Sequence, residues 1–236
     1  VEGLTEFLPV SSTGHMIITQ NLLGVPSGDE FVHAFTFIIQ FGAILSVVCL
    51  YWKRFFQIDH SPVPADEKSA FKRLIHPVKF YWLLFIGVLP AVIIGLAAKK
   101  SGLLDWLLDS VWVVAIMLVV GGIFMLYCDK LFNKGKEENQ VTEKRALSIG
   151  FFQCLSVIPG TSRSMATIVG GMANGLTRKR AAEFSFFLAV PTMAGATLLD
   201  LLDLLKGDST WASAHNLIML AVGCVVSFIV ALLAMK

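Results

Sequence analysis

The chain has 236 residues, of which 56% are hydrophobic and 15% are charged, and its mean hydropathy is +0.72. Soluble domains carry about a quarter charged residues, so this composition excludes an ordinary soluble protein and indicates an integral membrane protein. The formal net charge of +2 is too small to indicate a nucleic-acid partner, and we expect the lipid bilayer to surround most of the chain.

The opening stretch, EGLTEFLPVSSTGH at residues 2–15, places acids, a proline and hydroxyl residues in an apolar segment. Glu2 and Glu6 are four residues apart, so a helix puts both carboxylates on one face. Pro9 disfavours a continuous helix. The residues after it favour helix N-caps: Ser11, Ser12 and Thr13. The pattern predicts a helix, a break and a second helix, with hydroxyls and free backbone N–H groups at the break.

These features together predict a phosphate site. A helix N-terminus beside hydroxyls binds anions, and phosphate is the usual one. A carboxylate at membrane depth costs about 2.5–3.5 kcal/mol on insertion scales, so it normally faces a partner or a watery cavity. Two carboxylates on one face also repel each other unless a cation or proton lies between them. We therefore interpret Glu2 and Glu6 as ligands of a divalent metal or as an acid–base pair.

Ser12 and His15 are three residues apart, so their side chains can meet on one helical turn. A serine within reach of a histidine is the arrangement of an activated nucleophile. We favour Ser12 as the nucleophile of a phosphoserine route. A water held by Glu6 and a metal is the other route, and the sequence does not choose between them.

A second copy of the pattern follows at residues 153–164, QCLSVIPGTSRS, where Pro159 aligns with Pro9. This copy carries no acid but contains Arg163, whose planar fork binds two phosphate oxygens at once and stabilises a charged transition state. The phosphate cradle is predicted to comprise Ser11, Thr13, Gly160, Thr161, Ser162, Arg163 and Ser164. Gln153 and Thr167 are second-tier candidates, which packing explains equally well.

Several apolar runs are long enough to cross the hydrocarbon layer, which takes about 20 residues of helix. We expect five of them, at 31–52, 78–98, 111–128, 181–204 and 217–235. The two motifs, at 1–24 and 149–175, are each broken by proline and glycine. Such irregular backbone must be buried in protein or line a cavity, so we predict that each motif is a re-entrant helical hairpin.

The basic residues predict the topology. The connections at 53–77, 129–148 and 178–180 are rich in Lys and Arg, whereas 99–110 and 205–216 hold few. The basic-rich connections are expected in the cytoplasm. Three crossings then separate the two hairpins, so the second copy is inverted relative to the first.

The predicted fold is therefore an all-α integral membrane protein, a single domain over 1–236 built from an inverted-topology repeat. Repeat one covers about 1–128 and repeat two about 149–236. By symmetry we expect about six transmembrane helices, the last of them missing beyond Lys236.

At these residues the chain resembles the bacterial undecaprenyl-diphosphate phosphatase (BacA) family. The resemblance is carried by EGLTEFLPVSSTGH at 2–15 and PGTSRS at 159–164, with support from IQFGAILSVV at 39–48 and AAEFSFFLAVP at 181–191. Met165 departs from the pattern, because a small residue, often glycine, is expected there.

The resemblance implies a hydrolase that converts undecaprenyl diphosphate to undecaprenyl phosphate and inorganic phosphate. That reaction recycles the lipid carrier of peptidoglycan synthesis and is associated with bacitracin resistance. The family also implies a divalent cation such as Mg²⁺ or Ca²⁺, a homodimer in the bacterial inner membrane and a site that faces the periplasm. The alternative is a transporter or flippase for a phosphorylated polyprenyl lipid, since carriers also use inverted repeats with broken helices. The nucleophile and acid pair favour the enzyme.

Overall fold

The structure, a computed structural model, describes the whole chain except residues 26–29, 57–74, 104–106, 108–109, 133 and 207–212. The described part consists of helices joined by turns and loops, and it contains no strand. Its elements are α1 (Glu2–Thr5), α2 (Ser12–Leu22), α3 (Glu30–Leu50), α4 (Trp52–Phe56), η1 (His76–Val78), α6 (Lys79–Lys100), α8 (Val111–Phe132), α9 (Glu143–Gln153), η2 (Cys154–Val157), α10 (Arg163–Ala173), α11 (Arg178–Lys206) and α12 (Ala214–Ala234). The prediction of an all-α protein is confirmed.

Four stretches of the described residues are long and apolar enough to cross a membrane: His76–Lys100, Val111–Phe132, Arg178–Leu199 and Ala214–Ala234. The fifth predicted run is α3, a helix of 21 residues whose apolar part is Ala34–Leu50. The predicted limits need small corrections. The helix predicted at 111–128 continues to Phe132, and the one predicted from 181 begins at Arg178, so part of each basic-rich connection is helical.

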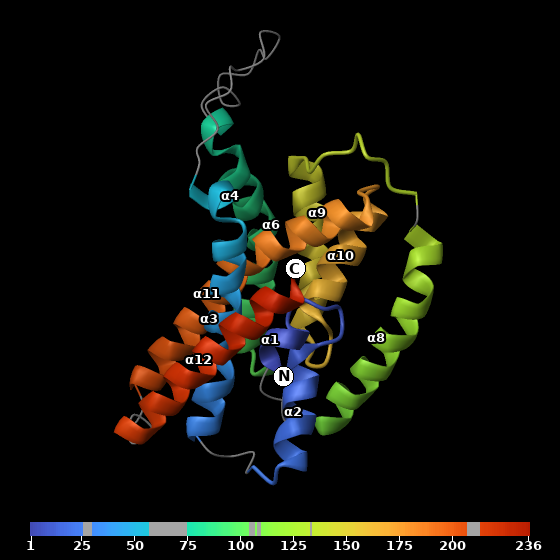
Figure 1. Cartoon of the computed structure of the whole chain (residues 1–236). Helices are drawn as coiled ribbons and strands as arrows, with labels where there is room; N and C mark the ends of the chain where they lie inside the picture. The colour runs from blue at the N-terminus through green and yellow to red at the C-terminus, as the bar shows by residue number, and fades with distance from the viewer. Residues whose placement is uncertain (26–29, 57–74, 104–106, 108–109, 133, 207–212) are drawn as a thin grey trace.

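Much of the predicted loop at 53–77 lies outside the described residues, including Lys68, Lys72 and Arg73. Its first residues form the short helix α4, which carries Lys53 and Arg54. Figure 1 shows α3 rising to the upper end of the molecule, where α8 ends and where α9 and α11 begin. The lower end holds the start of α8, and α12 runs from there back to the middle.

Glycines let neighbouring helices approach closely. A Cβ on Gly150 of α9 would lie 2.3 Å from the carbonyl oxygen of Gly87 on α6. A Cβ on Gly42 of α3 would lie 2.3 Å from the carbonyl oxygen of Cys224 on α12. Such contacts are typical of helix packing in membranes, where association depends on close van der Waals fit.

The two motifs meet in the middle of this helical frame. The helices α9 and α10 lie side by side, and the break between them is close to α1 and the N-terminus (Figure 1). Phe7, directly after α1, belongs to the main apolar core together with Ile168 and Met172 of α10 and Phe184 and Phe187 of α11. The core therefore fixes the first break against α10 and α11.

Candidate active site

The first break is built as the sequence predicts. The chain leaves α1 at Glu6, and Pro9 follows in a non-helical segment that reaches to Ser11. Ser11 adopts a φ of 63° and caps α2, since its Oγ accepts a hydrogen bond from the Gly14 N–H over 3.4 Å. A non-glycine residue in this left-handed region is uncommon and carries backbone strain.

The second break uses the same devices. The Thr161 N–H donates to the Ile158 carbonyl oxygen over 3.1 Å and closes a turn around Pro159 and Gly160. Gly160 has a φ of 88°, and a Cβ there would lie 2.6 Å from the carbonyl oxygen of Val114. Both its conformation and its surroundings therefore require glycine. Ser162 then caps α10 by accepting a hydrogen bond from the Met165 N–H over 3.2 Å.

Side chains from the two breaks meet at Glu6. Its Oε1 accepts a hydrogen bond from Nη2 of Arg163 over 3.0 Å, and its Oε2 accepts one from the Ser12 hydroxyl. Only 11% of the Arg163 side chain and 7% of the Glu6 side chain are exposed. The Ser164 hydroxyl donates to the Leu8 carbonyl oxygen over 2.7 Å and joins the two motifs a second time. The structure thus brings together residues 157 positions apart in the chain.

Arg163 is also fixed from α11. Its Nη1 donates to the Ser185 carbonyl oxygen over 3.3 Å. The hydroxyls of Ser185 and Thr167 lie 2.6 Å apart, and Thr167 donates back to the Arg163 carbonyl oxygen over 2.9 Å. Thr167, a second-tier candidate in the sequence, therefore supports the arginine.

Sequence reasoning missed Ser185, which is fully buried. A signal was present, because Ser185 is a lone hydroxyl inside the aromatic run Phe184-Ser185-Phe186-Phe187. A buried hydroxyl needs a hydrogen-bond partner, so its partner in the fold was the feature to look for.

Glu2 lies beside this cluster and is 2% exposed. Both of its carboxylate oxygens are buried without a hydrogen-bond partner, while the charges of Glu6 and Arg163 act on it. A buried carboxylate without a partner is unstable, so it must hold a proton or face a cation. The donor set fits a hard divalent cation, which prefers carboxylate oxygens. The rest of the described chain adds no third His, Cys, Asp or Glu to the pair, so other ligands would come from substrate and water.

The predicted pairing of Ser12 with His15 is wrong for this structure. Side chains in a first helical turn point back toward the N-terminus, and Ser12 accordingly reaches Glu6 across the break. Nδ1 of His15 instead lies 2.9 Å from the Ser11 carbonyl oxygen. His15 thus stands next to the site, while Glu6 is the base nearest the serine.

The remaining predicted residues surround the cluster or lie just outside it. Thr161 Oγ1 and Arg163 Nε are buried and have no hydrogen-bond partner. The hydroxyl is therefore free to donate or accept a hydrogen bond, and the Nε–H is free to donate one. Thr13 is half-buried, on the second residue of α2. Gln153 is fully buried at the end of α9, and its Nε2 donates to Thr192 Oγ1 over 3.2 Å. Its contact is with α11 rather than with Glu6.

This arrangement can perform group transfer to a hydroxyl. Ser12 has an acceptor for its proton, and Arg163 supplies a fixed positive charge with an unpartnered N–H. Two capped helices, α2 and α10, begin at the cluster and present backbone N–H groups. Fixed donors in a site of low dielectric constant stabilise developing negative charge on an oxyanion or a phosphoryl group.

Apolar helices that enclose a buried, charged centre define a multi-pass membrane protein. Over residues 1–236 the chain matches the family described as bacitracin resistance protein BacA. The chain belongs to this family, and it is a multi-pass protein of the bacterial inner membrane.

Curated relatives match along the entire chain. A protein of Porphyromonas gingivalis is 53% identical over 237 residues, which cover 100% of this chain and 83% of the relative. One from Flavobacterium psychrophilum is 48% identical over 236 residues, which cover 100% and 81%. A third, from Bdellovibrio bacteriovorus, is 45% identical over 240 residues, which cover 100% and 81%. Each of the three is named undecaprenyl-diphosphatase.

Proposed function

We propose that this protein is an undecaprenyl-diphosphate phosphatase, which hydrolyses undecaprenyl diphosphate to undecaprenyl phosphate and inorganic phosphate. The reaction returns the lipid carrier to peptidoglycan synthesis. The observation that carries the proposal is the chain of contacts from Ser12 through Glu6 to Arg163, which unites a hydroxyl, a base and a phosphate-binding cation. The relatives named undecaprenyl-diphosphatase match the whole length of the chain and supply the substrate class.

In the proposed reaction Ser12 Oγ attacks the terminal phosphorus and transfers its proton to Glu6. The bond from the terminal phosphorus to the bridging oxygen breaks, and undecaprenyl phosphate leaves. Arg163 stabilises the charge on the phosphoryl oxygens. Glu6 passes that proton to the departing phosphate before the second step. Water then attacks the phosphoserine and gives a proton to Glu6, the bond from phosphorus to Ser12 Oγ breaks, and Oγ takes the proton back from Glu6 as inorganic phosphate leaves. The hydrogen bond from Ser12 to Glu6 supports this route over one in which His15 is the base.

We further propose that Glu2 and Glu6 hold the divalent cation, Mg²⁺ or Ca²⁺. The orphaned oxygens of buried Glu2 are the support for this assignment. When bound, the cation would neutralise phosphate oxygens and act as a Lewis acid. It would also relieve the repulsion between the two carboxylates.

The decisive assay is phosphate release from undecaprenyl diphosphate by the purified protein in detergent, with and without a chelator. We expect release that stops with chelator and returns with Mg²⁺ or Ca²⁺. The absence of release under every metal condition would contradict the proposed function. A Ser12→Ala variant should lose at least about a hundredfold in turnover, as expected when a nucleophile or preorganised group is removed. Near-normal turnover in this variant would instead favour attack by water.

The flippase alternative is not favoured, because a carrier needs charge complementarity but no serine paired with a base. The inverted repeat remains part of the proposal. The helix that leads into each break packs on the second long helix of the opposite repeat. Thus α9 packs on α6, and α1 packs on α12. A glycine lies at each of these contacts. A Cβ on Gly150 would lie 2.3 Å from the Gly87 carbonyl oxygen. A Cβ on Gly3 would lie 2.4 Å from the Ser227 carbonyl oxygen. This equivalence supports two related halves with re-entrant hairpins.

A homodimer is also proposed, and its support is the family resemblance alone. Chemical crosslinking in native membranes would test it. A band of twice the monomer mass is expected, and a monomer at every crosslinker concentration would contradict it.

A further inference from the structure

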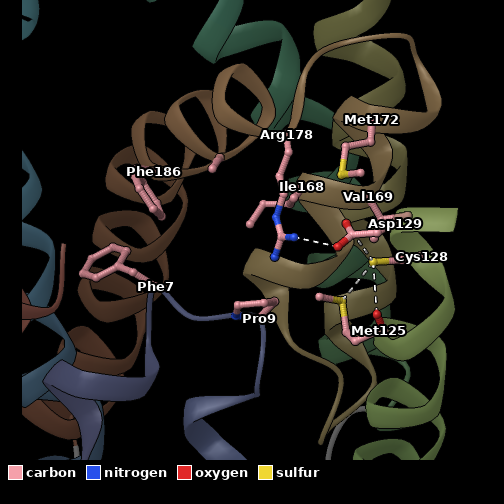
Figure 2. Close-up of a pocket in the computed structure, with 11 residues that line it drawn as sticks. Phe7, Pro9, Met125, Cys128, Asp129, Ile168, Val169, Met172, Arg178 and Phe186 are labelled. Carbon is pink, nitrogen blue, oxygen red and sulfur yellow. Dashed lines mark hydrogen bonds and ion pairs between the residues drawn. The ribbon is translucent and has the colours of Figure 1, made fainter. Parts of the chain in front are cut away.

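An apolar pocket of about 160 Å³ lies between α8, α10, α11 and the first break. Figure 2 shows the side chains that enclose it, with Phe7 and Pro9 of the break on one side and α8 on the other. The rings of Phe7 and Phe186 pack edge to face, with centroids 5.6 Å apart, and form part of its wall. Ile168, Val169 and Met172 of α10 line it as well.

The pocket shares its wall with the Glu6–Arg163 cluster. In three pairs of consecutive residues, the first residue belongs to the Glu6–Arg163 cluster and the second lines the pocket. These pairs are Glu6 and Phe7, Thr167 and Ile168, and Ser185 and Phe186. A ligand that occupies both places must therefore be charged at one end and apolar directly beside it.

One part of the pocket wall is polar. Arg178 and Asp129, which both line it, form an ion pair with Nη1 of the arginine 2.7 Å from the carboxylate, and the two side chains are more than half exposed (Figure 2). A long hydrocarbon chain would have to pass these charges to continue in that direction. The apolar part thus has room for a short group only.

We propose that this pocket binds the first isoprene unit of the lipid substrate, the one joined to the diphosphate. An apolar cavity of about 150 Å³ accommodates benzene, with its six carbons, so this pocket suits the five carbons of one isoprene unit. The remaining units leave sideways into the bilayer. The pocket selects for a prenyl group next to the diphosphate and does not measure the length of the chain. This inference rests on the proposed function.

The first test fills the pocket. Ala182 lines it from α11, and Ala182→Phe would occupy the space of the isoprene unit. We expect kcat/KM for farnesyl diphosphate to fall at least about tenfold, in the range that one poorly fitted apolar group costs a pocket. Methyl diphosphate has no isoprene unit, so its kcat/KM should stay within about twofold of the wild-type value.

The matched control is Ala196→Phe, which adds the same ring to an exposed position of α11 away from the pocket. Both substrates should react with this variant as they do with the wild type. The proposal would be overturned if Ala182→Phe lowered kcat/KM equally for both substrates, or if it lowered kcat/KM for neither.

A second test detects binding of the prenyl group in the pocket without relying on turnover. A farnesyl diphosphate with a diazirine on its first isoprene unit, irradiated on the wild-type protein, should label peptides that contain Met125 to Asp129 or Ile168 to Met172. Ala182→Phe should abolish this label, and adducts confined to other helices would overturn the proposal. A protein that releases no phosphate but is labelled here would refute the proposed function and leave the pocket assignment standing.

Discussion

At Glu6 both carboxylate oxygens are engaged, one by the Arg163 guanidinium and the other by the Ser12 hydroxyl. In the proposed reaction substrate phosphate shares Arg163 with this carboxylate, so the ion pair is then a resting arrangement that the substrate rearranges. Because the pair is almost fully buried, its loss is felt both in stability and in activity. Removing one partner of a buried ion pair costs about 3–5 kcal/mol, since it leaves a charge without compensation.

Arg163→Lys separates charge from geometry. Lysine keeps the positive charge but loses the planar fork that reaches Glu6 and Ser185 at once. We expect the variant to fold and to lose at least about a hundredfold in turnover, while Arg163→Ala loses more. Phosphate release by proteins of confirmed thermal stability is the measurement. Full activity in Arg163→Lys would reduce the arginine to a simple counter-charge, and full activity in Arg163→Ala would refute the composite site.

Glu2→Gln tests the metal assignment. Without metal the buried Glu2 side chain must take up a proton when the chain folds at neutral pH, which costs stability, so a neutral side chain there should raise Tm in chelator by about 2 °C or more. The same variant should lose most of the activity and most of the stabilisation by added Mg²⁺ or Ca²⁺ that wild type shows, because a ligand is gone. Glu138→Gln, at an exposed position, is the control and should behave as wild type. A metal-induced rise in Tm equal to that of wild type would remove Glu2 from the metal site.

Sequence reasoning performed unevenly at the residue scale. It placed Arg163 in one site with residues of the first break, because the two breaks share one pattern, and the structure brings Arg163 to Glu6. It chose His15 as the partner of Ser12 from helical spacing, whereas the side chain points back across the break to Glu6. Spacing within a helix describes neighbours on that helix only, and this contact comes from the fold of the break. Ser185 was missed for the same reason, since its partner Thr167 is on another helix.

At the scale of elements, glycine decides how closely the broken segments approach the long helices. Helix existence could be predicted from the apolar runs, but these contacts could not, since they depend on which faces meet. Helix ends were less accurate for a physical reason. Charged residues at the membrane surface continue a helix readily, and the extended ends of α8 and α11 contain such residues.

Gly150→Ala tests the contact between α9 and α6. Its Cβ would lie 2.3 Å from the backbone oxygen of Gly87, which cannot move aside as a flexible side chain can. Overpacking of this kind costs about 1–3 kcal/mol, so Tm in detergent should fall and activity with it. Gly122→Ala is the matched control, because Gly122 is in α8 and a Cβ there meets nothing within 4 Å. It should be neutral or stabilising by up to about 1 kcal/mol, and a similar fall in Tm for both variants would contradict the packing argument.

At the scale of the whole molecule, the proposed site exists only where the two halves meet. Neither motif alone contains a base, a hydroxyl and a guanidinium. The contact between the halves could be predicted from sequence in outline because their charges are complementary, an acid in one motif and an arginine in the other. The proposed inverted repeat would bring such segments to the same depth. The division into repeats about 1–128 and 149–236 stays a prediction.

The orientation of the molecule supplies the last prediction. The upper ends of α3 and α8 and the start of α9 adjoin the basic-rich connections, so this end should face the cytoplasm (Figure 1). In a background with the four cysteines replaced, Leu103→Cys just after α6 and Glu138→Cys between α8 and α9 are both exposed positions for labelling. A membrane-impermeant maleimide on intact spheroplasts should label position 103 at once and position 138 only after permeabilisation. Labelling of both from the same side would require an even number of crossings between them, and the inversion of the second motif relative to the first would then be lost.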